Sequence, residues 1–159
     1  MGILKLVFAV FISFIPGLLG IMISPIASGK NTWYGEIHHS MLTPAGWVFS
    51  AVWTLLYLLI GIALFLIMQK QNVTNQRALM SAYVLFAINL VLNTAWSFVF
   101  FGAHSPEYAL IVLMALIIVA VFMARAFFRI SVPAFWLTVP YIAWLMFAFY
   151  LNGVIIVLN

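Results

Sequence analysis

Two kinds of side chain are almost missing from this sequence. Cysteine is absent, which excludes a disulfide, a thiolate nucleophile, a cysteine-bound zinc site and an iron–sulfur cluster. Asp and Glu together number 2, and only 5% of the 159 residues are charged, whereas soluble domains carry about a quarter charged residues. A chain that is 68% hydrophobic, with a mean hydropathy of +1.27, is therefore expected to be an integral membrane protein.

The shortage of acids also limits catalysis. Glu36 and Glu107 are both predicted at the outer surface of the membrane, so no pair of carboxylates exists for general acid/base chemistry. His38, His39 and His104 are predicted at the same surface. Three imidazoles bind a transition metal in some proteins, but nothing beside these would orient them as ligands, and we predict no metal site. Apart from Tyr, no ionisable residue lies deep in a predicted span, which argues against a proton pump.

Five apolar segments are long enough to cross a bilayer as helices. They predict an all-α fold, an integral membrane bundle of five transmembrane helices in a single domain, residues 1–159, with spans at about 3–27, 44–68, 76–102, 105–128 and 132–157. Thr43 and Pro44 are candidates for the N-cap and first position of the second helix, and Ser105 and Pro106 for those of the fourth. Residues 28–43 form the long polar connection and are a candidate lid.

The charged residues predict how the chain lies in the membrane. One side of the five-span arrangement carries Lys5, Lys70, Arg77, Arg125 and Arg129, and the other carries Lys30, Glu36 and Glu107. The positive-inside rule then places the N-terminus in the cytoplasm, and the C-terminus and the loop 28–43 outside, in a bacterial inner membrane. The first segment is too long for a signal-peptide core, which favours a retained anchor. The scattered basic residues form no patch for nucleic acid.

The first segment combines a small-residue face with a proline. The face consists of Ser13, Gly17, Gly20 and Ser24. Small residues let two helices approach closely, so this face predicts packing either within the chain or against a second copy or another membrane protein. Pro16 leaves the carbonyl of Ile12 without its usual helical partner, which predicts a bend.

Polar and aromatic residues share one face in three of the predicted spans. Helical spacing groups Asn89, Asn93, Trp96 and Phe100; Ser50, Trp53, Tyr57 and Gly61; and Tyr141, Trp144, Ala148 and Asn152. Amides in hydrocarbon are costly unless they turn inward, either to form hydrogen bonds or to meet a ligand. These faces predict either a pocket for a planar, mainly apolar ligand or a solid aromatic core, and spacing alone does not decide between them.

Three motifs on three helices resemble one family. The motifs are Trp33-Tyr34, Pro44, Trp47-Val48-Phe49, Val52-Trp53, Leu56-Tyr57 and Gly61; then Asn93, Ala95-Trp96 and Phe100-Phe101-Gly102; then Pro140-Tyr141, Ala143-Trp144, Phe147 and Leu151-Asn152. In this order they resemble the translocator protein family, which includes TspO, the tryptophan-rich sensory proteins and the peripheral benzodiazepine receptor. The resemblance implies a five-helix bundle, often a homodimer, whose pocket opens toward the first loop and binds porphyrins, other tetrapyrroles or planar aromatic drugs.

The faces and the resemblance together give a candidate site. The expected ligand-binding residues are Phe49, Ser50, Trp53, Tyr57, Asn89, Asn93, Trp96, Tyr108, Trp144, Ala148 and Leu151. The resemblance implies a receptor or carrier that binds porphyrin or haem-like ligands and needs no cofactor of its own. Two alternatives remain open: light- and oxygen-dependent porphyrin degradation by Trp53 and Trp144, and a membrane assembly subunit. Leu42 and Ala45 replace a Trp and a Pro of the family's loop, which predicts a looser lid.

Overall fold

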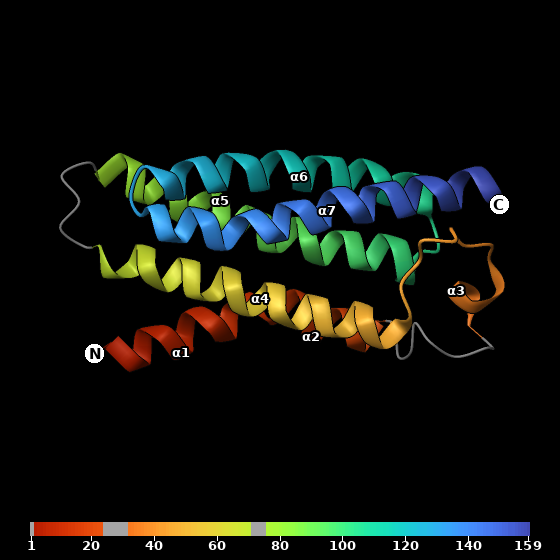
Figure 1. The fold of residues 1–159 in the computed structure, drawn as a ribbon, viewed down its shortest axis with the longest axis horizontal. Coiled ribbons are helices and arrows are strands. Elements are labelled where there is room, and N and C mark those ends of the chain that lie inside the picture. Colours follow the sequence, from red (N-terminus) through yellow and green to blue (C-terminus); the bar gives the residue numbers. More distant parts are fainter. Residues whose placement is uncertain (1, 24–31, 71–75) are drawn as a thin grey trace.

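In the computed structural model, residues 2–23, 32–70 and 76–159 are described. Every regular element among them is helical (Figure 1): α1 Gly2–Ser13, α2 Ile15–Ile23, α3 Trp33–Glu36, α4 Gly46–Gln69, α5 Gln76–Ser97, the π-helical turn η1 Phe98–Gly102, α6 Pro106–Phe128 and α7 Val132–Leu158. In this part of the chain 5 helical segments are long and apolar enough to cross a membrane: Gly2–Met22, Gly46–Gln69, Gln76–Gly102, Pro106–Phe128 and Val132–Leu158. The predicted all-α bundle of five spans is confirmed.

The spans form a closed ring. Helix α6 packs between α5 and α7, α7 packs on α4, and α4 packs on α1 (Figure 1). Helix α2 packs on α5, which closes the ring. The connections 103–105 and 129–131 are short, which makes α5, α6 and α7 antiparallel neighbours. The helix ends that carry the five basic residues of the predicted cytoplasmic side lie together, at the end of the bundle opposite α3. The direction of the chain across a membrane stays a prediction.

The first span is broken where the proline predicts it. Helix α1 ends at Ser13 and α2 begins at Ile15, with Phe14 in a turn between them. Pro16 has no N–H to donate to the carbonyl of Ile12, so the helical hydrogen-bond ladder is interrupted at this point. The predicted bend is confirmed, and it changes which helix the chain packs against.

The small-residue face is used within the chain. The hydroxyl of Ser13 donates to the carbonyl of Tyr57 over 2.8 Å. A Cβ on Gly17 would lie 2.7 Å from the Tyr57 ring, and one on Gly20 would lie 3.5 Å from the Ser97 hydroxyl. Of packing within the chain and packing against a second copy or another protein, the structure shows the first. The described positions are therefore not free for a second copy. Ser24 lies outside the described residues. A homodimer stays a prediction and would need another surface.

The sequence predicts the start of α6 more accurately than the start of α4. The predicted start of the second helix at Pro44, with Thr43 as N-cap, is wrong by two residues: α4 begins at Gly46 with Ala45 as N-cap. The reason is a turn in which the N–H of Thr43 donates to the carbonyl of Ser40 over 2.9 Å, so the chain enters the helix later. For α6, Ser105 at the N-cap and Pro106 in the first turn are confirmed.

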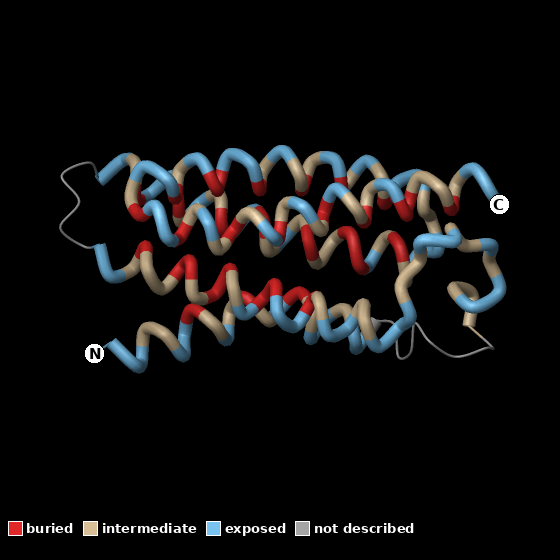
Figure 2. The backbone as a smooth tube through the Cα atoms, viewed as in Figure 1, coloured by how far each residue is buried: buried red, intermediate tan, exposed pale blue. Residues whose placement is uncertain are grey.

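Buried residues follow the inner sides of the helices, and exposed residues follow the outer sides (Figure 2). The exposed side chains are large and apolar on α6, for example Ile111, Met114, Ile118 and Phe122. In a membrane such side chains contact lipid tails rather than water. The inner faces, by contrast, hold fully buried polar residues, among them Asn89, Asn93 and Thr138. These buried polar side chains form part of the candidate site.

Candidate ligand-binding site

A chain of buried hydrogen bonds joins three helices at the centre of the bundle. Asn89 and Asn93 are four residues apart on α5 and therefore share a face. The hydroxyl of Tyr57 on α4 donates to Oδ1 of Asn93 over 2.9 Å. The Nδ2 of Asn93 donates to the hydroxyl of Tyr141 on α7 over 3.0 Å, and that hydroxyl donates to Oδ1 of Asn89 over 3.0 Å. The two amides thus turn inward and bind protein groups.

Another amide organises the end of the bundle near α3. The Nδ2 of Asn152 on α7 donates to the carbonyl of Pro106 over 2.8 Å, at the start of α6. Its Oδ1 accepts a longer hydrogen bond, 3.4 Å, from Nε1 of Trp96 on α5. Asn152 therefore links the Trp96 ring on α5 to the start of α6.

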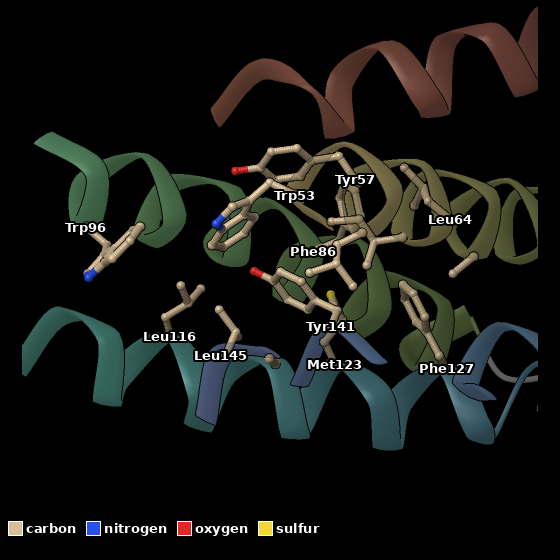
Figure 3. Close-up of a cluster of buried hydrophobic side chains, with 14 of the residues drawn as sticks. Trp53, Tyr57, Leu64, Phe86, Trp96, Leu116, Met123, Phe127, Tyr141 and Leu145 are labelled. Atoms are coloured by element: carbon tan, nitrogen blue, oxygen red, sulfur yellow. The ribbon is translucent and has the colours of Figure 1, made fainter. Parts of the chain in front are cut away.

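Trp53 lies among aromatic rings from α4, α5 and α7 (Figure 3). Its ring centroid is 5.2 Å from that of Tyr57, 6.1 Å from that of Trp96 and 6.4 Å from that of Tyr141. The rings of Trp53 and Trp96 are inclined by only 27°. Such offset and edge-to-face contacts stabilise ring pairs by about 0.5–1.5 kcal/mol beyond their burial. The Nε1 of Trp53 is buried and has no hydrogen-bond partner.

A cavity of about 630 Å³ adjoins this cluster, between α2, α4 and the end of α5. It is lined by Phe14, Pro16, Gly17, Leu18, Gly20, Ile21, Tyr34, Pro44, Gly46, Phe49, Ser50, Trp53, Thr54, Tyr57, Trp96, Ser97 and Phe101. Cavities that hold drug-sized molecules measure about 300–1,000 Å³ and are mostly apolar with a few polar groups. This lining matches that description, because it combines aromatic walls with a few hydroxyl groups and no charged side chain.

Five of the expected site residues line the cavity. They are Phe49, Ser50, Trp53, Tyr57 and Trp96. Asn89 and Asn93 stand behind this wall, and Asn93 is connected to the cavity through the Tyr57 hydroxyl. Whether a ligand touches any of these residues stays a prediction, but the structure brings all seven into one region.

The other four expected residues lie elsewhere. Ala148 and Leu151 are buried on α7 but do not line the cavity. Trp144 is half-buried, and its ring centroid lies 5.8 Å from that of Phe49, so it backs the cavity wall rather than forming it. Tyr108 is 68% exposed. The next residue, Ala109, is fully buried, and the 100° step per residue of an α-helix turns Tyr108 away from the bundle.

The sequence prediction missed the contribution of the first span. Six lining residues lie between Phe14 and Ile21, in and just before α2. The small-residue spacing indicated a close helix contact, and nothing in it indicated that a cavity adjoins that contact. Two other missed residues had a signal: Ser97 follows Asn93 by four positions and Thr54 follows Ser50 by four, so each continues a polar face that the sequence already shows.

The loop between the first two spans covers one end of the cavity. Tyr34 and Pro44 are among the lining residues, and the Tyr34 ring packs on Phe100 and Phe101 with centroids 6.0 and 5.6 Å apart. Burial raises the pKa of the Tyr34 hydroxyl above its ordinary value, so this group is uncharged at neutral pH. Leu42, at the position of the family's loop Trp, is 63% exposed. In this chain Tyr34 is therefore the aromatic residue of the loop that covers the end of the cavity.

The described part of the loop is tied to the helix ends. The N–H of His38 donates to Oδ1 of Asn159 over 2.8 Å, and Nδ2 of Asn159 donates back to the carbonyl of His38 over 3.1 Å. The rings of Trp33 and His104 stack with centroids 4.7 Å apart. Nε2 of His39 is hydrogen-bonded to the carbonyl of Tyr34 over 2.7 Å. Within the residues described here, no three metal-binding side chains gather.

Comparison with known proteins gives one consistent relationship. The model of the TspO/MBR family matches residues 9–158. The chain is 43% identical to the tryptophan-rich protein TspO of Chlorobaculum tepidum over 119 residues, 73% of this chain and 72% of that protein. It is 35% identical to the protein of the same name from Archaeoglobus fulgidus, over 100% of this chain and 99% of the relative. It is 31% identical to the tryptophan-rich sensory protein of Cereibacter sphaeroides, over 91% of this chain and 87% of the relative. The chain belongs to the TspO/MBR family, as its motifs indicate.

Proposed function

We propose that this membrane protein is a receptor or carrier that binds porphyrin or a related tetrapyrrole in the cavity between α2, α4 and α5. The observation that carries the proposal is the cavity itself, which has aromatic walls on several sides and no charged side chain in its lining. Broad ring faces and a small number of hydroxyl groups suit a large flat molecule that is mainly apolar. Relatives named translocator protein and tryptophan-rich sensory protein support transport or sensing as the use of such binding.

The packing explains why the walls suit a flat guest. Tyr57 is held by its hydrogen bond to Asn93. Trp53 is held by ring contacts with Tyr57 and Tyr141, and Trp96 packs on the Phe100 ring. Side chains that are fixed before a ligand arrives lose less conformational entropy when it binds. Ring planes that are already set also favour guests whose own planes match them.

The proposal is tested with two tryptophans of α4. Trp53 lines the cavity, whereas Trp47 is 76% exposed and is not in the lining. Purified wild-type protein, Trp53→Phe and Trp47→Phe are titrated with protoporphyrin, and the change in porphyrin absorbance is followed because it does not depend on which tryptophan has been removed. Phe keeps a ring with a smaller face than indole, so part of a ring contact of about 0.5–1.5 kcal/mol is lost and the Kd of Trp53→Phe rises by up to about 12-fold.

The matched variant separates cavity binding from adsorption to the protein surface. Trp47→Phe should bind protoporphyrin with the wild-type Kd, and thermal unfolding should show that both variants are folded. Two results would contradict the proposal: wild-type protein that shows no saturable binding, or saturable binding with the same Kd in wild type and in Trp53→Phe.

A further inference from the structure

The cavity reaches the outside of the bundle on one flank. Leu18 and Ile21 on α2 line the cavity and are 49% and 69% exposed. Ser50 and Thr54 on α4 also line it and are exposed. A residue that both lines a cavity and is exposed on the outer surface marks the rim of an opening. The rim residues come from α2 and α4, so the opening lies between these two helices.

The break in the first span explains why the two helices part there. Before the break, α1 lies tightly on α4: a Cβ on Gly61 would lie 2.8 Å from the Cα of Val10 and 2.7 Å from the hydroxyl of Ser13. After the break, Gly20 faces Ser97 of α5 instead. The chain thus leaves α4 at Phe14 and Pro16 and crosses to α5. This leaves a space between α2 and α4. The Tyr57 ring, against which Gly17 packs, forms part of the wall of this space.

The opening faces hydrocarbon rather than water. Helix α4 has 24 residues and is about 36 Å long, whereas the apolar core of a bilayer is about 30 Å thick. A centred helix therefore leaves the core by only about 3 Å at each end, while Ser50 and Thr54 lie about 6 and 12 Å along the axis from Gly46. Both rim residues are within the depth of the lipid tails, in the half of the bilayer nearer α3.

The hydroxyl groups at the rim already donate hydrogen bonds within α4, so the rim has few groups left to bind water. The hydroxyl of Ser50 donates to the carbonyl of Gly46 over 3.2 Å, and that of Thr54 donates to the carbonyl of Ser50 over 2.9 Å. Hydroxyl donors that are bound to their own helix do not need solvent, and such back-bonding is how Ser and Thr are accommodated among apolar neighbours. An apolar guest passing this rim breaks no hydrogen bond of the protein.

The path from the water end is different. There the cavity is roofed by Tyr34 and Pro44, and the described part of the loop is fastened by the His38–Asn159 hydrogen bonds and by the stacking of Trp33 on His104. A molecule that enters past Tyr34 and Pro44 meets this fastened part of the loop, whereas a molecule that enters between α2 and α4 does not.

We propose that the opening between α2 and α4 is a lateral portal, through which a flat apolar ligand passes between the cavity and the lipid tails of the half-bilayer nearer α3. The portal rests on the proposed function, because it concerns the route to the same cavity. It assigns the ligand to a chemical class that the cavity alone does not: molecules that partition into membranes.

The absence of cysteine from the chain makes the route testable by cross-linking. Ile21→Cys with Ser50→Cys places one thiol on each side of the portal, and a short bismaleimide joins them after folding in liposomes. The same double variant capped with a monofunctional maleimide carries similar bulk without the link. Ser40→Cys with Tyr150→Cys serves as the loop control, because the two hydroxyl groups are 3.4 Å apart and neither residue lines the cavity.

The readout is the rate of protoporphyrin binding and release, with the porphyrin supplied in the liposome membrane. Linking the portal should slow association and dissociation by the same factor, about tenfold or more relative to the capped form, while the Kd stays the same. An equal change in both rates marks an altered path rather than an altered site. Linking the loop should leave both rates unchanged.

Other results overturn the portal. If linking the loop slows both rates and linking the portal does not, the ligand arrives through the roof. If neither link changes the rates, the portal is not the route. If the capped protein binds protoporphyrin and linking changes only one of the two rates, so that the Kd shifts, the link affects the cavity and the portal is refuted. If even wild-type protein shows no saturable binding, the proposed function fails, and this result is distinguishable from a failure of the portal alone.

Discussion

Replacing Tyr141 by Phe tests the hydrogen-bond chain at the centre of the bundle. The Tyr141 hydroxyl is fully buried, accepts from Asn93 over 3.0 Å and donates to Asn89 over 3.0 Å. Phe keeps the ring and its packing but removes both hydrogen bonds at once. Nδ2 of Asn93 and Oδ1 of Asn89 are then left in an apolar interior without a partner, and an unsatisfied buried polar group is costly.

The expected loss can be compared with that of two other Tyr→Phe changes. Hydrogen bonds inside membrane proteins contribute on average about 0.6 kcal/mol and at most about 1.7 kcal/mol. Tyr141→Phe, which removes two, should lower the free energy of unfolding by about 1–3.5 kcal/mol, and Tyr57→Phe, which removes one, by about half of that. Tyr150→Phe should have almost no effect, because its hydroxyl is exposed to the surface and lies 3.4 Å from that of Ser40, beyond the usual O–H···O range.

The measurement is the free energy of unfolding in bicelles, followed by far-UV circular dichroism as denaturant is added. The double variant Tyr141→Phe with Asn89→Leu sharpens the test. Replacing both partners of a buried hydrogen bond by apolar groups of similar shape is much less costly than replacing one, so the double variant should be more stable than the sum of the two single losses predicts. If Tyr141→Phe costs no more than Tyr150→Phe, the hydrogen-bond chain does not stabilise the bundle and the reasoning is refuted.

Two further predictions concern close packing and the loop. Gly17→Ala should lower the melting temperature, because its Cβ would lie 2.7 Å from the Tyr57 ring and overpacking costs about 1–3 kcal/mol. Its control, Gly153→Ala, has nothing within 4 Å of its Cβ and should raise the free energy of unfolding by up to about 1 kcal/mol. Equal melting temperatures of the two variants would contradict the close contact. Asn159→Ala removes both hydrogen bonds to His38 and should speed amide hydrogen exchange in residues 33–42 about fivefold, while Ser81→Ala, at the other end of the bundle, should leave that exchange unchanged. Unchanged exchange in Asn159→Ala would show that these bonds do not hold the loop.

Periodicity predicts the inner faces of this protein well. Asn89, Asn93 and Trp96 are buried on one side of α5, as the 100° helical step requires, and Phe100 in η1 is buried as well. The physical reason concerns Asn89 and Asn93: in hydrocarbon a carboxamide has no solvent to bind, so both side chains have to point at the bundle interior. The five spans are also evident in the sequence, because each is a long apolar run.

The position of the cavity is harder to predict, because it depends on where helices separate. Tyr108 and Ala148 show the difficulty: the resemblance implies both as site residues, yet Tyr108 is exposed and Ala148 is buried without lining the cavity. The decisive feature is the direction of α2 after Pro16. A proline predicts that a helix bends, but the bend direction follows from contacts with other helices, here Gly20 against Ser97, and these are non-local.

The distribution of hydrogen-bond partners indicates which molecules the proposed site would favour. The amide of Asn93 is used by Tyr57 and Tyr141, the amide of Asn152 by Trp96 and the Pro106 carbonyl, and the rim hydroxyls by their own helix. A ligand therefore meets mainly ring faces and alkyl groups, where one added or removed small group changes affinity by only about 1–3 kcal/mol. Within a series of planar porphyrins, affinity should follow the apolar area that becomes buried, and a porphyrin distorted from planarity by bulky ring substituents should bind more weakly than a planar one of equal hydrophobicity. Equal binding of the two by absorbance titration would show that the ring walls do not select for shape.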